Sequence, residues 1–401
     1  MLHLKSDLRT MYVNYLIHKE IDDLYVSVFI KLLAESFISV FIPVFLLNLG
    51  YGIFEIILFY LVRFIALSLF MYIFFHVCSF IGVKKVLAIG TVFLILTYFS
   101  LNFLETGLNF FIPAIMIGLS TGSYYAAYHF ELSKSIQPKK EAKNISIVKI
   151  IAILTATLGP LIGAFIIDTR SFSLVFIIAS ILLLISIIPL FFTADFKIKK
   201  EKVNLKKIFK CDTPEKALSY QFEGFLHVFD LLFWPIFIYA MIGSISDLGK
   251  IVSFASLFMI LFVKYIGKWS DKNPHKVLET GALIYSPLWL VKLLLITPTG
   301  FFISNILNQS SRSMIELGFH KIVYADAHKR KDLIAYFTFR QINLLIGRIV
   351  MFLIALFCYF VISEKSIYAL CQVIFIIAAF VTVVYVFLLK KIISKNASKS
   401  Y

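Results

Sequence analysis

The sequence has few charged residues for its length, since aspartate, glutamate, lysine and arginine make up only 15% of its 401 residues. Soluble domains carry about 25% charged residues, which keep their surfaces in contact with water. Hydrophobic residues make up 60% of this chain instead, and its mean hydropathy is +0.90. This composition excludes an ordinary water-soluble domain and indicates a membrane protein.

Cysteine is also scarce, with four residues in the whole chain, and no two of them have the C-x-x-C spacing. The sequence therefore indicates neither a disulfide framework nor a zinc site. The histidines have no convincing metal-ligand spacing, and no glycine-rich phosphate-binding loop occurs. We expect no metal and no cofactor, and ATP is not indicated as the energy source.

Long apolar runs fill most of the chain, and a helix of about 20 such residues crosses roughly 30 Å of hydrocarbon. The runs are continuous, which disfavours a β-barrel, because barrel strands alternate apolar and polar residues. We therefore predict an all-α polytopic membrane protein. The twelve predicted transmembrane helices cover residues 24–48, 52–80, 85–104, 108–132, 145–167, 171–194, 218–243, 247–266, 277–297, 300–325, 332–362 and 366–391.

The longest polar break spans residues 195–217 and contains eight lysines. Lysine and arginine in short loops mark the cytoplasmic side of a membrane protein. When successive loops are assigned to alternating sides, 27 lysines and arginines fall on the side of this break and three on the other. We therefore expect both termini and residues 195–217 in the cytoplasm, with the protein in the plasma or inner membrane.

Basic residues outnumber acidic ones, and the formal net charge is +16. The loop lysines account for this excess, because they lie where they meet anionic lipid headgroups. Nucleic-acid binding needs a contiguous basic folded face, which the sequence does not indicate. We expect membrane lipids as partners and no nucleic acid.

The two halves of the chain resemble each other. Residues 42–45 match 234–237, and residues 85–87 match 276–278, at offsets of 192 and 191. Two parallel repeats of six helices each account for such an offset. The predicted division is a cytoplasmic N-terminal segment (1–23), an N-terminal six-helix bundle (24–194), a basic cytoplasmic linker loop (195–217), a C-terminal six-helix bundle (218–391) and a cytoplasmic tail (392–401).

The end of the linker has the pattern of a helix start. Thr213 is a capping residue, Pro214 suits the first turn, and Glu215 lies near the positive end of the expected helix. We expect the helix after the linker to begin there.

In the loop between the predicted helices 247–266 and 277–297, Gly267 is followed by Asp271, Lys272 and, after a turn, Lys276. This pattern resembles the loop motif of the major facilitator superfamily. Independently of the family, a carboxylate on a tight cytoplasmic turn can meet the positive end of a neighbouring helix, and flanking cations can pair across it. In a transporter, such contacts form in one state and break in the other. The alternative is an ordinary charged turn. The expected cytoplasmic gate residues are Gly267, Asp271, Lys272 and Lys276.

The matching loop of the first half departs from the family, because Ser79 stands where the family usually has aspartate. In the predicted helix 145–167, the residues Gly159, Pro160 and Gly163 resemble the family's glycine–proline motif, which is associated with antiporters. Glycine lets helices approach closely and proline bends a helix. The motif favours export over import, and helix packing alone is the alternative.

Polar residues inside the predicted helices form stripes on single helix faces. A charge at the centre of a membrane helix costs about 2.5–3.5 kcal/mol on insertion scales, so such stripes are expected to face a wet cavity. In the superfamily, the first, fourth, seventh and tenth helices line the central cavity, and these helices carry the stripes here. The expected substrate-cavity residues are Lys31, Glu35, Tyr124, Tyr128, Glu223, His227, Asp230, Trp234, Asn305, Gln309, Arg312 and Glu316.

The residue types suggest how the cavity could hold a solute. We expect Arg312, Lys31 or both to hold an anionic group. Trp234, Tyr124 and Tyr128 could stack on an apolar or ring portion of the solute.

The carboxylates Glu35, Asp230 and Glu316 are candidates for proton carriage, because desolvation favours the protonated form. The alternative is internal pairing, because Lys31–Glu35 and Arg312–Glu316 both have the i,i+4 spacing at which helix side chains meet.

Four further charges in the predicted helices are not assigned to the substrate site. Arg63, Arg340 and Arg348 are interpreted as tethers between the halves, and Lys292 as a side chain that snorkels to a membrane face.

The resemblance implies a secondary active transporter that moves a small solute by alternating access. We expect proton coupling, export rather than import, and a monomer. The alternatives are a transporter-like sensor or scaffold that moves no solute, and a lipid or lysolipid transporter. No enzyme is expected, because the G-x-S-x-G pattern at residues 118–122 lies within an apolar helix rather than on a strand–turn–helix element.

Overall fold

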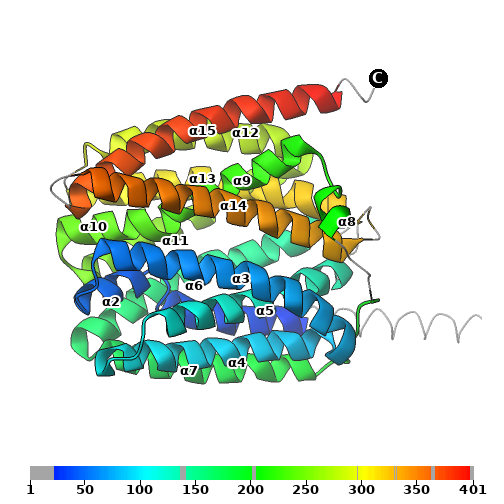
Figure 1. The fold of residues 1–401 in the computed structure, drawn as a ribbon, viewed down its shortest axis with the longest axis horizontal. Coiled ribbons are helices and arrows are strands. Elements are labelled where there is room, and N and C mark those ends of the chain that lie inside the picture. Colours follow the sequence, from blue (N-terminus) through cyan, green and yellow to red (C-terminus); the bar gives the residue numbers. More distant parts are fainter. Residues whose placement is uncertain are drawn as a thin grey trace, which may run out of the picture.

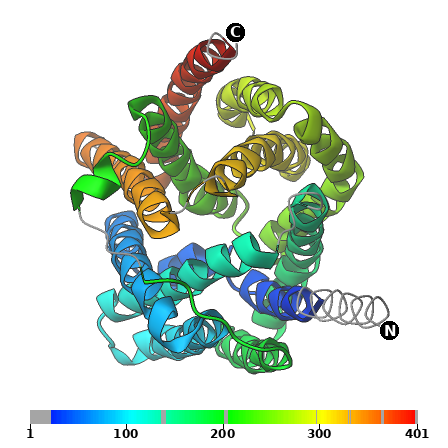
Figure 2. The ribbon, with the colours of Figure 1, turned by 90° about the vertical axis from the view of Figure 1, so that its right-hand side faces the viewer.

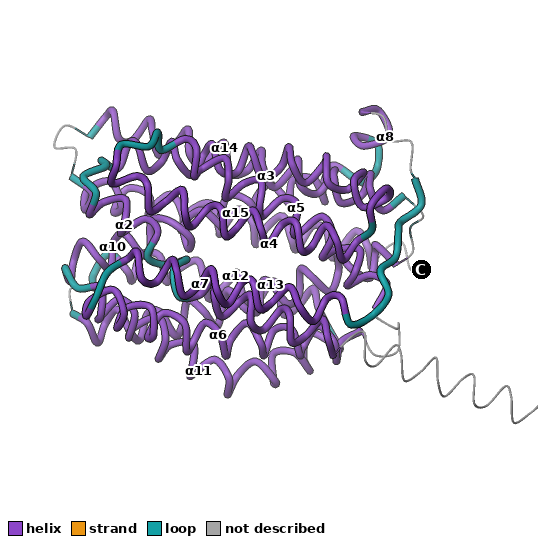
Figure 3. Tube along the Cα trace, turned by 90° about the horizontal axis from the view of Figure 1, so that it is seen from below, coloured by secondary structure: helices purple, strands orange, loops and turns teal. Residues whose placement is uncertain are grey.

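The computed structural model describes residues 22–135, 141–200, 205–295, 297–328, 330, 332–362 and 366–397. All regular elements within these ranges are helices, and most run along the long axis of the molecule (Figure 1, Figure 3). Eight of these helices are long and apolar enough to cross a membrane. The predicted all-helical membrane class is therefore confirmed, while the count of twelve spans stays a prediction.

The helices follow one another with short connections. Before the central polar stretch lie a helical segment at 22–36, α2 (Ile42–Asn48), α3 (Ile53–Ile81), α4 (Val83–Asn102), α5 (Phe111–Ser135), α6 (Glu141–Thr169) and α7 (Phe172–Ile187). After its start come α8 (Leu205–Phe209), α9 (Pro214–Val228), η3 (Phe229–Phe233), α10 (Trp234–Ile242), α11 (Ile245–Lys272), α12 (Pro274–Lys292), α13 (Pro298–His328), α14 (Leu333–Val361) and α15 (Ile367–Ala397).

The predicted first helix, 24–48, is interrupted by a turn at residues 37–41. Pro43 lies in the first turn of α2 and cannot donate a backbone hydrogen bond to the preceding turn, so the helix is broken ahead of it. Gly159 and Gly163 of α6 pack against this break. A Cβ atom on Gly163 would collide with the carbonyl oxygen of Phe37, so only glycine permits this close approach.

The corresponding helix of the second half is also irregular. It starts at Pro214, where the Thr213 hydroxyl accepts the backbone N–H of Lys216 at 3.4 Å, as the sequence predicted. The π-helical turn η3, which contains Asp230, separates α9 from α10. Such π turns are frequent at functional sites, and Pro235 follows directly after this one.

Helices from the two halves of the sequence meet along two seams. One seam joins α6 to α11, and the other joins α3 to α14 (Figure 1). At the first seam, a Cβ on Gly249 of α11 would lie only 2.6 Å from the Cβ of Ala164 on α6. Figure 2, which looks along the helices, shows α9, α13, α14 and α15 (green, gold, orange and red) together on one side of these seams.

The start of the central stretch is bound to the first half of the chain. The Asp195 carboxylate accepts the backbone N–H groups of Lys84 at 2.9 Å and Lys85 at 3.3 Å, at the N-terminus of α4. The Phe196 carbonyl accepts the N–H of Val83 at 2.9 Å. A carboxylate at this position satisfies free N–H groups and lies at the positive end of the helix dipole.

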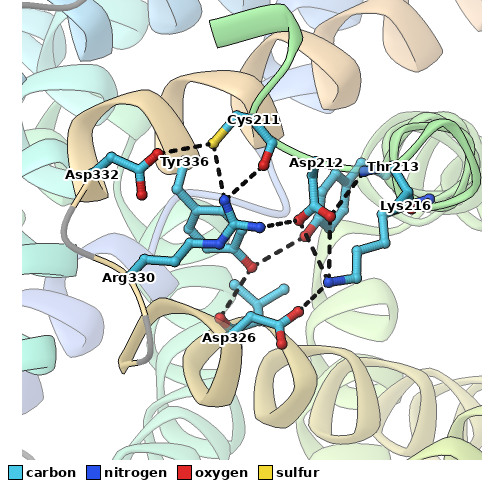
Figure 4. Close-up of polar contacts among 10 residues, drawn as sticks. Cys211, Asp212, Thr213, Lys216, Asp326, Arg330, Asp332 and Tyr336 are labelled. Atoms are coloured by element: carbon cyan, nitrogen blue, oxygen red, sulfur yellow. Dashed lines mark hydrogen bonds and ion pairs between the residues drawn. The ribbon is translucent and has the colours of Figure 1, made fainter. Parts of the chain in front are cut away.

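The end of the central stretch is bound to the second half (Figure 4). Arg330 donates to the carbonyl of Cys211 at 2.7 Å and to the carboxylate of Asp212 at 3.0 Å. Lys216 forms ion pairs with Asp212 at 3.5 Å and with Asp326 at 2.5 Å. The central stretch thus connects one half to the other with each of its ends held by a different half.

Burial and nearby charges shift the pKa values of Cys211 and Arg330, which hold the end of the central stretch. Burial raises the pKa of the Cys211 thiol to about 11, although Arg330 opposes the shift. Burial lowers the pKa of Arg330, but Asp212, Cys211, Asp332 and Tyr336 together more than offset this, and the pKa rises. The guanidinium is therefore held in its charged form where it joins the linker to the start of α14.

Candidate functional site

A cavity of about 560 Å³ lies between helices from both halves of the chain. A smaller cavity of about 290 Å³ adjoins it and shares Tyr128, Glu316, His320 and Tyr324 with its lining. A groove of about 730 Å³ near α3, α4 and α7 is larger, but mostly exposed apolar side chains line it. The central cavity is the candidate site, because charged groups from both halves converge there.

Eight of the twelve predicted cavity residues line one or both of these cavities. They are Lys31, Glu35, Tyr124, Tyr128, Glu223, His227, Arg312 and Glu316. The other four, which are Asp230, Trp234, Asn305 and Gln309, do not line either cavity and lie among the helices of the second half.

Arg312 on α13 is the centre of a buried ion-pair network. Its two terminal nitrogens donate to the Glu223 carboxylate of α9 at 3.1 and 2.5 Å, in a bidentate arrangement. Its Nε lies 3.4 Å from Asp230 and 3.5 Å from Glu316. The expected i,i+4 contact with Glu316 is present, but the bidentate partner is Glu223, on another helix. One guanidinium thus faces three carboxylates, which more than balance its charge.

Asp230, on the π turn η3, is held from two sides. The Tyr285 hydroxyl donates to it at 2.7 Å, and the Asn308 amide donates at 2.9 Å. Asn308 also accepts the Lys292 ammonium at 2.7 Å, so its amide bridges a cation and an anion. This arrangement satisfies both buried charges through one neutral side chain.

The prediction that Lys292 snorkels to a membrane face is wrong, because its exposed fraction is 0%. Its ammonium lies 3.3 Å from the centroid of the Trp289 ring and 4.1 Å from that of Trp234. Both rings stabilise the cation where water does not reach. Nothing in the sequence around Lys292 indicated that two tryptophans from different helices would enclose it.

Trp234, Asn305 and Gln309 hold helices of the second half together. The Trp234 indole donates to Asn305 at 3.1 Å, and the indole itself is 3% exposed. Gln309 accepts the hydroxyl of Ser256 on α11 at 3.1 Å. These contacts give all three side chains a structural role, because each one packs against or hydrogen-bonds to a neighbouring helix.

The first half contributes a second ion pair. Lys31 contacts Glu35 at 2.7 Å and lies 3.9 Å from the centroid of the Tyr124 ring. Tyr124 stacks on Tyr128 with ring centroids 6.0 Å apart. The i,i+4 pairing that the spacing allowed is therefore formed, and the charge of Lys31 is balanced within its own helix.

Sequence reasoning assigned Arg63, Arg340 and Arg348 to tethering, yet all three line the central cavity. Arg340 is 9% exposed and Arg348 is 8% exposed. The sequence contained a signal for this cavity position. Arg340 and Arg348 are eight residues apart, which puts them on one broad side of the helix. A buried charge in a membrane helix is costly and therefore indicates a polar surrounding. The structure adds that α3 brings Arg63 to the same cavity.

Polar contacts between the halves also occur at both ends of the cavity. His129 of α5 and Tyr324 of α13 share a hydrogen bond of 2.8 Å, and His129 stacks on Phe337 of α14 at 4.7 Å. At the opposite end of the helices, the Tyr239 hydroxyl of α10 donates to Asn48 of α2 at 2.9 Å.

The predicted cytoplasmic gate lies at the junction of α11 and α12. Gly267, Asp271 and Lys272 form the last turns of α11, and Lys276 is in the first turn of α12, so the turn itself is a single residue. Asp271 pairs with Lys321 of α13 at 2.7 Å, within the second half.

The first-half counterpart of this contact was not foreseen. The sequence search looked for an acid at Ser79, but Asp195 supplies the carboxylate at the N-terminus of α4. Asp195 is more than 100 residues from Lys84 in the sequence, so no local motif could have indicated this contact.

Comparison with known families identifies the chain. The model of the Major Facilitator Superfamily matches residues 24–246, which is more than half of the 401 residues. The chain belongs to this superfamily and is a membrane transporter. No curated protein matches it significantly.

Two solved structures have a similar fold. The human organic anion transporter MFSD10 (TETRAN) has a TM-score of 0.68 and 12% identity, over 93% of this chain and 99% of that one. A POT family transporter in complex with 5-aminolevulinic acid has a TM-score of 0.69 and 12% identity, over 91% of this chain and 95% of that one. At such low identity these likenesses concern the fold alone.

Proposed function

We propose that the protein is a secondary active transporter that moves a small solute by alternating access. In this proposal two six-helix bundles, at residues 24–194 and 218–391, rock about the central cavity. The observation that carries the proposal is a cavity of about 560 Å³ with charged side chains from both halves in its wall. Membership in the superfamily supports the same reading.

The contacts between the halves suggest how the rocking would proceed. At the α6–α11 seam, Gly249 of α11 lies directly against Ala164 and Pro160 of α6 and allows close sliding contact. Opening one end of the cavity would separate His129 from Tyr324, and opening the other would separate Asn48 from Tyr239. Residues 195–217, whose two ends are held by different halves, would connect the bundles without blocking this motion.

Proton coupling is assigned to the cavity carboxylates. Glu316 lines both cavities and lies 3.5 Å from Arg312, farther than the bidentate partner Glu223. Protonation of Glu316 would therefore leave the Arg312 charge balanced by Glu223 and Asp230. Glu35, which pairs with Lys31, is a second carrier in this scheme.

The remaining features of the proposal follow from the sequence. The lysine-rich loops place residues 195–217 and both termini in the cytoplasm of a plasma or inner membrane. Gly159, Pro160 and Gly163 favour export. The transporter acts as a monomer surrounded by membrane lipids.

Counterflow in proteoliposomes tests the transport function. Vesicles that contain the purified protein and an unlabelled candidate solute should accumulate the labelled solute, and protein-free vesicles should not. Binding of solutes without any exchange would contradict transport and favour a sensor. Exchange confined to lysolipids would identify the lipid-moving alternative.

Proton coupling has its own measurement. Imposed pH gradients should drive net uptake or release, and Glu316→Gln should retain counterflow while losing the response to the gradient. Retained coupling in Glu316→Gln and in Glu35→Gln would remove both residues as carriers.

A further inference from the structure

Three arginines form a positively charged group in the wall of the central cavity. Arg63 comes from α3, and Arg340 and Arg348 come from α14, so the group spans the α3–α14 seam between the halves. The Phe64 ring lies between two of them, with its centroid 5.5 Å from the Arg63 guanidinium carbon and 4.4 Å from that of Arg348.

No carboxylate of the described residues forms an ion pair with any of these arginines. None of the three arginines takes part in a salt bridge between described residues. Nε of Arg340 and both Nε and Nη1 of Arg348 are buried without a hydrogen-bond partner among those residues. The Nδ1 atom of His227, in the same cavity wall, is also buried without a partner.

The other cations around the cavity already have carboxylate partners. Arg312 faces Glu223, Asp230 and Glu316, and Lys31 faces Glu35. The two cavities together are lined by five cations, which are Lys31 and the four arginines, and by three carboxylates, which are Glu35, Glu223 and Glu316. Their lining therefore carries an excess of two positive charges, and the cations without an ion-pair partner among the described residues are those of the arginine group. Buried cations of this kind are costly unless an anion meets them, because desolvation removes the stabilisation that water supplies.

We infer that Arg63, Arg340 and Arg348 form an anion-binding site, and that the transported solute is a small organic anion with two oxyanion groups. This deepens the proposed transport function and rests on it for the claim that the anion is carried across the membrane. A guanidinium matches the planar or forked oxygens of carboxylate and phosphate with two parallel hydrogen bonds.

The geometry favours two oxyanion groups over one. Arg340 and Arg348 are eight residues apart on α14, which separates their backbones by about 12 Å along the helix axis. One group would meet Arg348 with Arg63 around the Phe64 ring, and the other would meet Arg340. Tyr98 and Tyr125 in the same lining supply contacts for a ring or apolar body between the two groups.

Binding to the purified full-length protein tests the site. The probes are succinate, isophthalate and terephthalate, and isophthalamide serves as the neutral analogue of isophthalate. At matched ionic strength, at least one of the dianions should raise the thermal unfolding temperature in a concentration-dependent way, and isophthalamide should not. Stabilisation by isophthalamide equal to that by isophthalate would overturn the inference, as would the absence of an effect from all three dianions.

Substitutions locate the binding. Arg348→Gln and Arg340→Gln should each weaken the affinity for the dianion about ten- to hundredfold, the range for a lost hydrogen bond to a charged group. The control Lys250→Gln removes an exposed positive charge away from the cavity and should leave the affinity unchanged. Arg348→Lys keeps the charge and should bind between the wild type and Arg348→Gln. Unchanged affinity in both glutamine variants, with normal unfolding temperatures in the absence of probe, would contradict the site.

Counterflow with the dianion that binds separates this inference from the transport function. Binding that requires the arginines, without exchange, would uphold the anion site and contradict transport. Exchange of an uncharged solute by a protein that neither binds nor exchanges dianions would uphold transport and overturn the anion site.

Discussion

Buried charged side chains in this protein are of two kinds, and the difference lies in their partners. Arg312 has a bidentate carboxylate and two further carboxylates within 3.5 Å. Arg348 is equally buried, but none of the described carboxylates forms an ion pair with it. The first arrangement stabilises helix contacts within the second half, and the second arrangement leaves a charge for a ligand.

In the Arg312 network, we predict that loss of the arginine destabilises the protein more than loss of one carboxylate. Arg312→Gln leaves two or three carboxylates facing each other, so we expect a loss of about 3–5 kcal/mol in the free energy of unfolding. Glu223→Gln should cost less, about 1–3 kcal/mol, because Asp230 and Glu316 remain near the guanidinium. Unfolding in a denaturing detergent, followed by helical circular dichroism, measures both.

A surface pair provides the control for this experiment. Lys250 and Asp247 contact each other at 3.1 Å, but both side chains are more than 40% exposed. Breaking this pair with Lys250→Gln should change stability by about 1 kcal/mol or less. Equal losses for Arg312→Gln and Glu223→Gln would mean that the three carboxylates do not share one guanidinium.

Single residues also show where sequence reasoning reaches its limit. The contact of Lys31 with Glu35 could be predicted, because one helix turn brings the two side chains together. The enclosure of Lys292 by Trp289 and Trp234 could not, because it depends on how α12 packs against the start of α10. The cavity position of Arg348 likewise depends on which face of α14 meets α3.

Among the elements, α6 depends most on small residues. Gly163 lies against the backbone of Phe37, and Gly249 of α11 lies against Ala164 of α6. A larger side chain at either glycine would push α6 away from a neighbour. Close backbone approach is how membrane helices gain contact energy, because lipid removes the hydrophobic driving force between them.

Gly163→Ala is therefore expected to destabilise the protein by about 1–3 kcal/mol, the usual effect of overpacking. Counterflow should slow as well, because α6 forms one seam between the proposed bundles. Gly300→Ala in the first turn of α13 is the control, since its nearest neighbour is the Thr297 hydroxyl at 3.1 Å. A Gly163→Ala protein as stable as the control would show that α6 can shift without loss.

The elements themselves were the most predictable feature of the chain. Thr213 and Pro214 gave the start of α9 correctly, because a helix cap is a local arrangement. The turn at residues 37–41 and the π turn η3 were missed, although Pro43 and Pro235 belong to the matched segments of the two halves. Continuous hydrophobicity predicts a membrane helix but does not report a local break in it.

At the scale of the whole molecule, contacts between the two halves are what alternating access must break. Asn48 and Tyr239 form one such contact at the end of the helices away from α8 (Figure 1). Ser173 of α7 donates a hydrogen bond to Asn102 of α4, and this contact lies within the first half. Cross-linking the first pair should stop the motion of the halves, whereas cross-linking the second should not.

The test uses a chain whose four native cysteines are replaced by alanine, with the pair Asn48→Cys and Tyr239→Cys and a short bis-maleimide. Complete cross-linking should abolish counterflow, because the two halves could no longer separate at that end. The control pair Asn102→Cys and Ser173→Cys, treated with the same reagent, should keep its exchange rate. A protease site placed at residues 201–204 reveals the first cross-link, because the cleaved halves then stay joined on a denaturing gel. Undiminished exchange after complete joining of residues 48 and 239 would contradict alternating access by separation of the halves at this end.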